Sequence, residues 1–202
     1  MPGKIHWPLF TLGNGRTPMR PAAGNQMVIT GYNDDWPNQF SRIKKILEDN
    51  LTGFMKIEHV GSTSIAGMCA KPVIDIDIVI DSILDFEKIR DELGQIHYRH
   101  QGDLGIPGRE AFKRDGSVFH ETLDSISHNL YVCAQDNAEL KRHILFRDYL
   151  KKNEKRRNEY KKIKNDIIAK YGNEDRKKYV DVKETEYKWF FEEVIAEASA
   201  TI

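Results

Sequence analysis

The alternation of apolar and polar residues is clearest over residues 73–80, where the chain reads Val-Ile-Asp-Ile-Asp-Ile-Val-Ile. Successive side chains of a β-strand point to opposite faces, so the four isoleucines form one apolar face. Asp75 and Asp77 fall on the other face, between two valines. The pattern therefore predicts a strand that buries one face and holds two carboxylates side by side on the other.

Similar patterns predict the remaining elements. Apolar residues at helical spacing predict one helix from near residue 35 to residue 53 and another from 82 to 96. Short strands are expected over residues 56–60, 98–101, 110–114, 118–122 and 127–133. Beyond residue 136, helical spacing predicts three helices, at about 140–150, 160–171 and 187–195. The predicted fold class is therefore α+β: a small mixed β-sheet with flanking helices, followed by a C-terminal helical bundle.

The chain divides into three parts. Residues 1–26 contain eight of its prolines and glycines, which predicts a flexible N-terminal extension. Residues 27–135 carry the predicted strands and form the α+β core. Residues 136–202 form a C-terminal helical region that we expect to pack on the core.

Composition narrows the possible functions. The 202 residues include 31 Lys and Arg against 31 Asp and Glu, so the whole molecule has no general attraction to polyanions. Basic residues outnumber acidic ones between residues 141 and 188, however, and the remainder is net acidic. A basic helical part beside an acidic site could steer a phosphorylated ligand; the alternative is a set of solvated helix faces.

Cysteine content and hydropathy indicate the cellular compartment in which the protein is expected. Cys69 and Cys133 are the two cysteines of the chain and form no metal-type cluster, which is typical of a reducing environment. No apolar stretch approaches the roughly 20 residues needed to span a membrane. These features predict a cytoplasmic protein that does not associate with a membrane.

A Gly-Ser turn precedes the strand that carries the two aspartates. Gly61-Ser62 follows one predicted strand and opens a short predicted helix, where free backbone N–H groups can bind an anion. The hydroxyls of Ser62, Thr63 and Ser64 would add donors. The alternative is that Ser62 simply caps the helix.

The two aspartates of the strand also admit two interpretations. They could face water on a half-exposed strand. Their valine neighbours instead suggest an apolar wall, where adjacent carboxylates repel unless a cation, a proton or a basic side chain compensates. Asp75 and Asp77 are thus candidate ligands of a divalent cation.

Together, these motifs resemble a known superfamily. Gly61-Ser62, a gap of 12 residues and then Asp75-Ile76-Asp77 resemble the nucleotidyltransferase superfamily, which has the DNA polymerase β-like fold. More narrowly, the chain is similar to the GrpB family of bacterial nucleotidyltransferase-like proteins from about residue 28 to residue 195. The residues that carry this resemblance are Tyr32, Trp36-Pro37, Glu58 to Ser64, Ala70 to Pro72, Gly108-Arg109, His128 to Val132, Phe146 to Leu150, Tyr160, Lys164, Tyr179 and Lys183.

The resemblance implies roles for particular residues. Asp75 and Asp77 would hold Mg²⁺ or Mn²⁺, and the turn at Gly61, Ser62, Thr63 and Ser64 would hold a triphosphate. Lys71 and Arg109 could each neutralise phosphate or form a structural ion pair, and Lys183 could reach the cleft from the C-terminal helices. Nucleotidyltransferases usually supply a third acid from a later strand, where this chain carries His128. His128 is therefore a candidate base or metal ligand, or the transfer activity has been lost.

Three functional hypotheses follow. The first is a Mg²⁺-dependent nucleotidyltransferase that moves a nucleotidyl group from a nucleoside triphosphate to an acceptor, with Asp75, Asp77 and His128 as its catalytic residues. The alternative is a non-catalytic protein that binds a nucleotide or another phosphorylated small molecule and lacks the third acid. Nucleic-acid binding through the basic helices ranks last, because the aromatic residues interleaved there resemble core packing.

Overall fold

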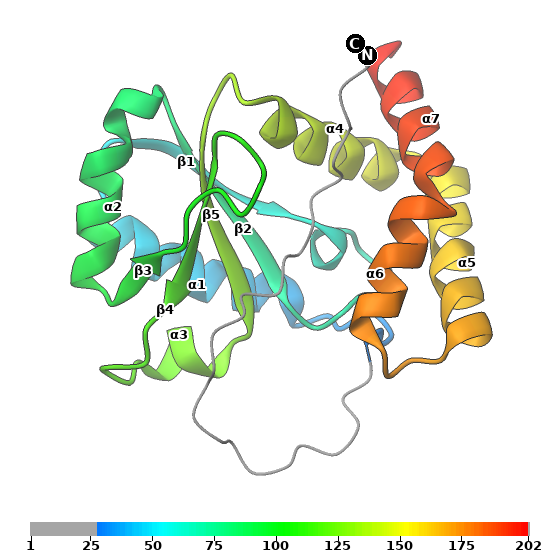
Figure 1. The fold of residues 1–202 in the computed structure, drawn as a ribbon, viewed down its shortest axis with the longest axis horizontal. Helices are drawn as coiled ribbons and strands as arrows, with labels where there is room; N and C mark the ends of the chain where they lie inside the picture. Colours follow the sequence, from blue (N-terminus) through cyan, green and yellow to red (C-terminus); the bar gives the residue numbers. More distant parts are fainter. Residues whose placement is uncertain (1–27, 202) are drawn as a thin grey trace.

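A five-stranded mixed sheet forms the centre of the molecule (Figure 1). The computed structural model describes residues 28–201, so the predicted extension over residues 1–26 lies outside the described residues. The strands lie in the order β1-β2-β5-β4-β3. Their bounds are β1 Phe54–Val60, β2 Ile74–Ile80, β3 Tyr98–His100, β4 Arg109–Arg114 and β5 His128–Ala134.

Strand β2, which carries the two aspartates, lies between β1 and β5. It pairs with β1 in antiparallel and with β5 in parallel fashion. The other two pairings, β4 with β5 and β3 with β4, are antiparallel. The prediction of a small mixed sheet within an α+β fold is therefore confirmed.

Three helices cover one face of the sheet: α1 Trp36–Asn50, α2 Phe86–Gln95 and α3 Glu121–Ser125. A short 3-10 turn, η2 Ile83–Asp85, precedes α2, and Ser82 and Asp85 form a capping box there. The four isoleucines of β2 pack into this core together with Ile43 and Leu47 of α1, and all six side chains are completely buried. The alternation that predicted β2 thus also defines the main hydrophobic core.

The opposite face of the sheet lies under α4 Ala138–Lys152, whose Leu140 packs against Val79 and Tyr131. Beyond α4 follow α5 Glu154–Tyr171, α6 Arg176–Thr185 and α7 Lys188–Ser199. These helices stand at one side of the sheet (Figure 1). They share a second, aromatic-rich core around Tyr160, Phe190 and Phe191. None of the helices within residues 28–201 is long and apolar enough to cross a membrane.

Two local predictions were wrong. Residues 118–122 do not form a strand: Val118 and Phe119 are exposed, and α3 begins at Glu121. The side chain of His120 caps this helix by accepting a hydrogen bond from the backbone N–H of Leu123. A segment with alternating apolar and polar residues forms a strand only where a neighbouring strand can pair with it.

The second wrong prediction concerns the C-terminal helices, which number four rather than three between residues 136 and 201. The additional helix is α6, where Asp175 accepts a hydrogen bond from the backbone N–H of Lys178. Only two apolar residues of α6, Tyr179 and Val182, are buried. Such a sparse apolar stripe gives a weak periodic signal, and packing against the neighbouring helices compensates for it.

Candidate functional site

The two aspartates occupy the same buried face of the central strand. All seven residues of β2 are buried, including Asp75 at 7% exposure and Asp77 at 0%. The parallel register places Asp75 beside Asn129 of β5, and the antiparallel register places Asp77 beside Glu58 of β1. Paired residues of adjacent strands project to the same side of a sheet. Of the two interpretations that the sequence left open, a half-exposed strand with its carboxylates in water is therefore wrong.

Asp75 is bound tightly into its surroundings. Its Oδ1 accepts a hydrogen bond of 2.7 Å from the side-chain amide of Asn129. Burial raises the pKa of Asp75 to about 6, and the nearby Asp77 adds to the rise, whereas the Asn129 hydrogen bond opposes it. A carboxyl group with this pKa is readily ionised by an approaching cation.

Gly61 allows the other oxygen of Asp75 to approach the turn. A Cβ atom at Gly61 would lie 2.3 Å from Oδ2 of Asp75, and the residue has a φ angle of 70°. Both the close approach and the backbone conformation require glycine. The turn therefore requires glycine at position 61 because of a contact with the carboxylate of Asp75.

Asp77 lies deeper than Asp75. One oxygen of its carboxylate, Oδ2, is 3.2 Å from Nδ1 of His143 on α4. The other, Oδ1, is buried and has no hydrogen-bond partner within residues 28–201. A buried carboxylate oxygen without a partner is unusual and is available to a cation.

The carboxylates at this site suit a divalent cation that also has ligands from a bound molecule. No three His, Cys, Asp or Glu side chains within residues 28–201 are grouped so that they could hold a metal ion by themselves. Mg²⁺, however, is commonly bound by one or two carboxylates together with substrate phosphates and water. Asp75 and the unpartnered oxygen of Asp77 fit that pattern, so these two residues could hold Mg²⁺ or Mn²⁺.

The predicted short helix after Gly61 is a single 3-10 turn, η1 Ser62–Ser64. The hydroxyl of Ser64 donates to the carbonyl of Gly61, at 2.6 Å. The hydroxyl of Thr63 lies 3.3 Å from the carbonyl of Val73 and 3.0 Å from Nε2 of His59. Thr63 and Ser64 therefore stabilise the turn, and Ser62 is left to interact with the helices.

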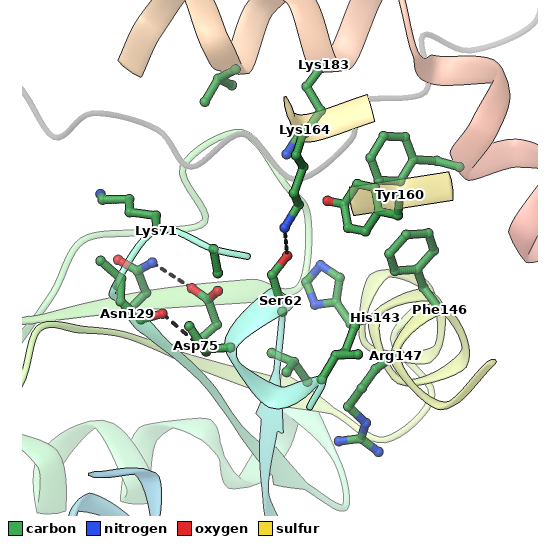
Figure 2. A pocket seen from close by; sticks show the side chains of 18 of the residues that line it. Ser62, Lys71, Asp75, Asn129, His143, Phe146, Arg147, Tyr160, Lys164 and Lys183 are labelled. Atoms are coloured by element: carbon green, nitrogen blue, oxygen red, sulfur yellow. Dashed lines mark hydrogen bonds between the residues drawn. The ribbon is translucent and has the colours of Figure 1, made fainter. Parts of the chain in front are cut away.

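A cavity lies between this turn, the aspartate face of the sheet and helices α4 to α6. Figure 2 shows that lysines approach it from several directions: Lys71 from the loop before β2, Lys164 from α5 and Lys183 from α6. Burial lowers the pKa of Lys183. Aromatic side chains of the bundle, among them Phe146 and Tyr160, form the opposite wall. The cavity thus combines a carboxylate, several cations and an aromatic surface.

Arg109 also lines this cavity, from strand β4. The side chain is almost completely buried, and its guanidinium carbon lies 4.4 Å from the centroid of the Tyr131 ring. Arg109 thus lies within reach of the site, and its cation stacks on an aromatic ring of the neighbouring strand.

His128 lies on the other face of the sheet. It pairs with Ile74, so it projects into the core with the isoleucines and away from Asp75. Its Nδ1 lies 2.7 Å from the carbonyl oxygen of Ile126, which can only accept, so Nδ1 carries the proton and donates. In a neutral imidazole the other nitrogen, Nε2, is then an acceptor, and the hydroxyl of Tyr98 donates to it at 2.6 Å. Burial lowers the pKa of His128. The predicted placement of His128 beside the aspartates is thus corrected, because its strand register turns it to the opposite face.

Three residues that the sequence did not single out for the site belong to it: Asn129, His143 and Lys164. Asn129 could have been found from the alternation of β5, since it is the polar neighbour of His128 that must face the other way. His143 carries no signal, and Lys164 is one of the residues that carry the family resemblance, but no local pattern places either at the site because the orientation of their helices depends on packing. All three line the cavity.

An ion pair fastens α4 to the sheet next to the cavity. Nη1 of Arg147 lies 2.6 Å from Oε2 of Glu58 on β1 and also donates a hydrogen bond to the carbonyl of His59. A second contact joins Arg147 to Asp148, at 2.7 Å. These contacts hold the helix that carries His143 in a fixed position over Asp77.

Comparisons with known proteins agree with this architecture. The GrpB protein family matches residues 26–195. The Glutamate-rich protein GrpB of Alkalihalophilus pseudofirmus is 32% identical over 174 residues, which cover 85% of this chain and 95% of that protein. A UPF0157 protein of Halalkalibacterium halodurans is 30% identical, over 87% of this chain and 84% of its own length.

A solved structure shares the fold. The crystal structure of the conserved protein GrpB from Enterococcus faecalis has a TM-score of 0.68 and 26% sequence identity, and it covers 84% of this chain and 98% of that one. The family match, the curated relatives and this structure all point the same way. The chain belongs to the GrpB family.

Proposed function

We propose that this protein binds a nucleoside triphosphate, or another phosphorylated small molecule, together with Mg²⁺ or Mn²⁺. One observation carries the proposal: the buried carboxylate of Asp75, which has Asp77 beside it on the same strand face, lines a single cavity with lysines from three separate elements. Carboxylates attract a divalent cation and lysines attract phosphate oxygens. A phosphate ligand with its cation satisfies both sets of charges at once.

Each part of the cavity has a role in this proposal. Asp75 and Asp77 would hold the cation, which neutralises charge on the phosphate oxygens when bound. Lys71, Lys164 and Lys183 surround the phosphate, and Ser62 offers a hydroxyl group from the turn. The aromatic wall around Phe146 and Tyr160 gives a flat, apolar surface suited to the ring of a base.

Nucleotidyl transfer is the second candidate. It is favoured by the two carboxylates at alternate positions of a central strand, the arrangement expected from the family resemblance. The residue beside Asp75 on β5 is Asn129, however, and an amide cannot accept a proton as a third carboxylate would. Binding without turnover is therefore better supported than transfer.

Calorimetry tests the proposal. We expect ATP, GTP, CTP or UTP to bind in the presence of Mg²⁺ and to lose affinity in EDTA. The double variant Asp75→Asn/Asp77→Asn should lose the metal-dependent part while it remains folded. Asp49→Asn, an exposed carboxylate on α1, serves as the matched control and should bind as the wild type does.

One result would contradict the proposal, and another would rank nucleotidyl transfer above binding. If none of the four nucleotides binds with either Mg²⁺ or Mn²⁺, the proposal fails. Pyrophosphate release from a bound triphosphate, abolished in the double variant and retained in Asp49→Asn, would instead place nucleotidyl transfer first.

A further inference from the structure

Lys164 is a buried lysine at the boundary between the helical bundle and the Gly-Ser turn. Only 2% of the residue is exposed. Its Nζ donates to Oγ of Ser62 at 2.6 Å and to the carbonyl of Cys69 at 2.7 Å. Nζ also lies 4.4 Å from the centroid of the Tyr160 ring. Two of the three ammonium hydrogens thus have oxygen acceptors, and the third has an aromatic face.

No carboxylate pairs with Lys164 within the described part of the chain, residues 28–201. The basic side chains that fasten the helices differ in this respect: Arg147 contacts Glu58 and Asp148, and Arg156 contacts Glu193 and Glu197. A buried cation without an acidic partner destabilises the folded state. Such a group is retained more readily if a ligand supplies the missing negative charge.

The position of Lys164 indicates where that charge would come from. Figure 2 shows the side chain extending from the bundle to Ser62, and both residues line the cavity that contains Asp75. Ser62 also interacts with the hydroxyl of Tyr160. The lysine, the serine and the tyrosine therefore form one polar network where the helical bundle meets the Gly-Ser turn.

We propose that Lys164 is the anion-binding residue of the cavity and holds a tetrahedral oxyanion, such as a phosphoryl group of the ligand, beside Ser62. This inference rests on the proposed function, because it assigns the anionic end of the ligand to a particular wall. The third ammonium hydrogen faces the Tyr160 ring, and an anionic oxygen would be a stronger acceptor for it than the ring.

Anion binding at this position should be linked to proton uptake. Burial lowers the pKa of Lys164 to about 7; Lys183 adds to the fall, whereas Cys69 and Asp75 oppose it. The ring of Tyr160 lies against the amine of Lys164, and Tyr179 lines the same cavity. An oxyanion beside the amine favours the charged form, so the bound anion should raise this pKa and bind more tightly at lower pH.

Sulfate is a suitable probe because it carries the same shape and charge type as a phosphoryl group and does not titrate near neutral pH. We would measure its binding to the full chain by calorimetry in EDTA, at about pH 6 and about pH 9, where Lys164 should be mostly charged and mostly neutral. The wild type should bind sulfate about tenfold or more weakly at the higher pH, which corresponds to a pKa rise of about one unit on binding.

Three variants separate the effect of Lys164 on sulfate binding from the effects of other groups in the cavity. Lys164→Met should lose sulfate binding at both pH values. Lys164→Arg keeps the charge at both pH values, so it should bind sulfate with the Lys164 part of the pH dependence removed. Lys162→Met removes an exposed lysine from the same helix and should behave as the wild type does.

The inference is overturned if wild-type protein does not bind sulfate at about pH 6, or if Lys164→Met binds it as the wild type does. Should Lys164→Met fail to fold, Lys164→Arg decides alone: an unchanged pH dependence overturns the inference. The result is distinguishable from the test of the proposed function. Mg²⁺-dependent nucleotide binding that persists in Lys164→Met would reject this inference alone, whereas Lys164-dependent sulfate binding without nucleotide binding would reject the cation-dependent proposal alone.

Discussion

The two faces of strand β2 are equally buried and chemically opposite. On one face, four isoleucines are completely enclosed by α1, α2 and α3. On the other, Asp75 lines the cavity and Asp77 lies beneath His143 of α4, at exposures of 7% and 0%. The apolar face stabilises the fold by removing hydrocarbon from water, whereas the acidic face buries carboxylates at a cost in stability. One face of β2 therefore stabilises the fold, and the other carries the candidate binding residues. Mutations on the two faces should have different effects.

The largest expected effect is on the apolar face. Ile76→Ala should lower the free energy of unfolding by about 2 to 5 kcal/mol, because it leaves a cavity in a closely packed core. Urea denaturation measures this loss, and nucleotide or sulfate binding should be unchanged at temperatures where the variant is folded. Ile83→Ala, at a half-exposed position, is the control and should cost less than about 0.5 kcal/mol. A loss below about 1 kcal/mol for Ile76→Ala would contradict the assignment of this face to the core.

The next effect concerns the contact between the turn and the acidic face. Gly61→Ala would place a Cβ atom against Oδ2 of Asp75 in addition to straining the backbone, so it should cost about 2 to 4 kcal/mol and weaken ligand binding. Gly102→Ala is the matched control, since its φ angle of 77° is also positive but no atom lies within 4 Å of the added carbon. It should show the backbone strain alone and bind ligand normally. Equal losses in the two variants would mean that the approach of Asp75 is unimportant.

A smaller effect of opposite sign is expected at Asp75. Burial raises the pKa of Asp75 from 3.8 to about 6, so the folded chain binds more protons than the unfolded chain between these values. The metal-free wild type therefore loses stability as the pH rises through this window, and Asp75→Asn does not. The variant should be more stable by on the order of 2 kcal/mol above about pH 7, and the difference should disappear below about pH 4.

Urea denaturation in EDTA at several pH values measures the effect at Asp75, with Asp49→Asn as the exposed control. The same variant should lose metal-dependent nucleotide binding, so its gain in stability and its loss of binding occur together. A variant that is less stable than the wild type at neutral pH would show that Asp75 is structural rather than held for a ligand.

The smallest effect tests whether His128 belongs to the structural face. Tyr98→Phe removes the hydroxyl that donates to Nε2 of His128 and should cost about 1 to 2 kcal/mol, the usual loss when a buried acceptor is left without its donor. Ligand binding should not change, because the pair lies across the sheet from the cavity. A loss of binding in this variant, measured by the same calorimetry, would return His128 to the site.

Most of the sheet could be predicted from the sequence because its signals are local. The alternation of residues 73–80 predicted the strand, its two faces and the position of Asp75 and Asp77 on the same face. The Gly-Ser motif predicted a turn directly after the preceding strand, as the structure has it. The strand prediction for residues 118–122 was wrong for the complementary reason: alternation persists there, but no neighbouring strand pairs with the segment, and Phe119 is left exposed.

Tertiary structure decided which side chains accompany the two aspartates. The sequence by itself determined the family, the α+β fold class and the carboxylate pair, since each depends on spacing within short segments. The parallel register of β2 and β5 placed Asn129, rather than His128, beside Asp75, because a shift of one residue exchanges the two faces of a strand. Packing of α4 against the sheet brought His143 to Asp77, and packing of α5 against α4 brought Lys164 to Ser62. Long-range pairing and helix packing, which no local pattern encodes, thus converted two acids on a strand into a cavity with charges of both signs.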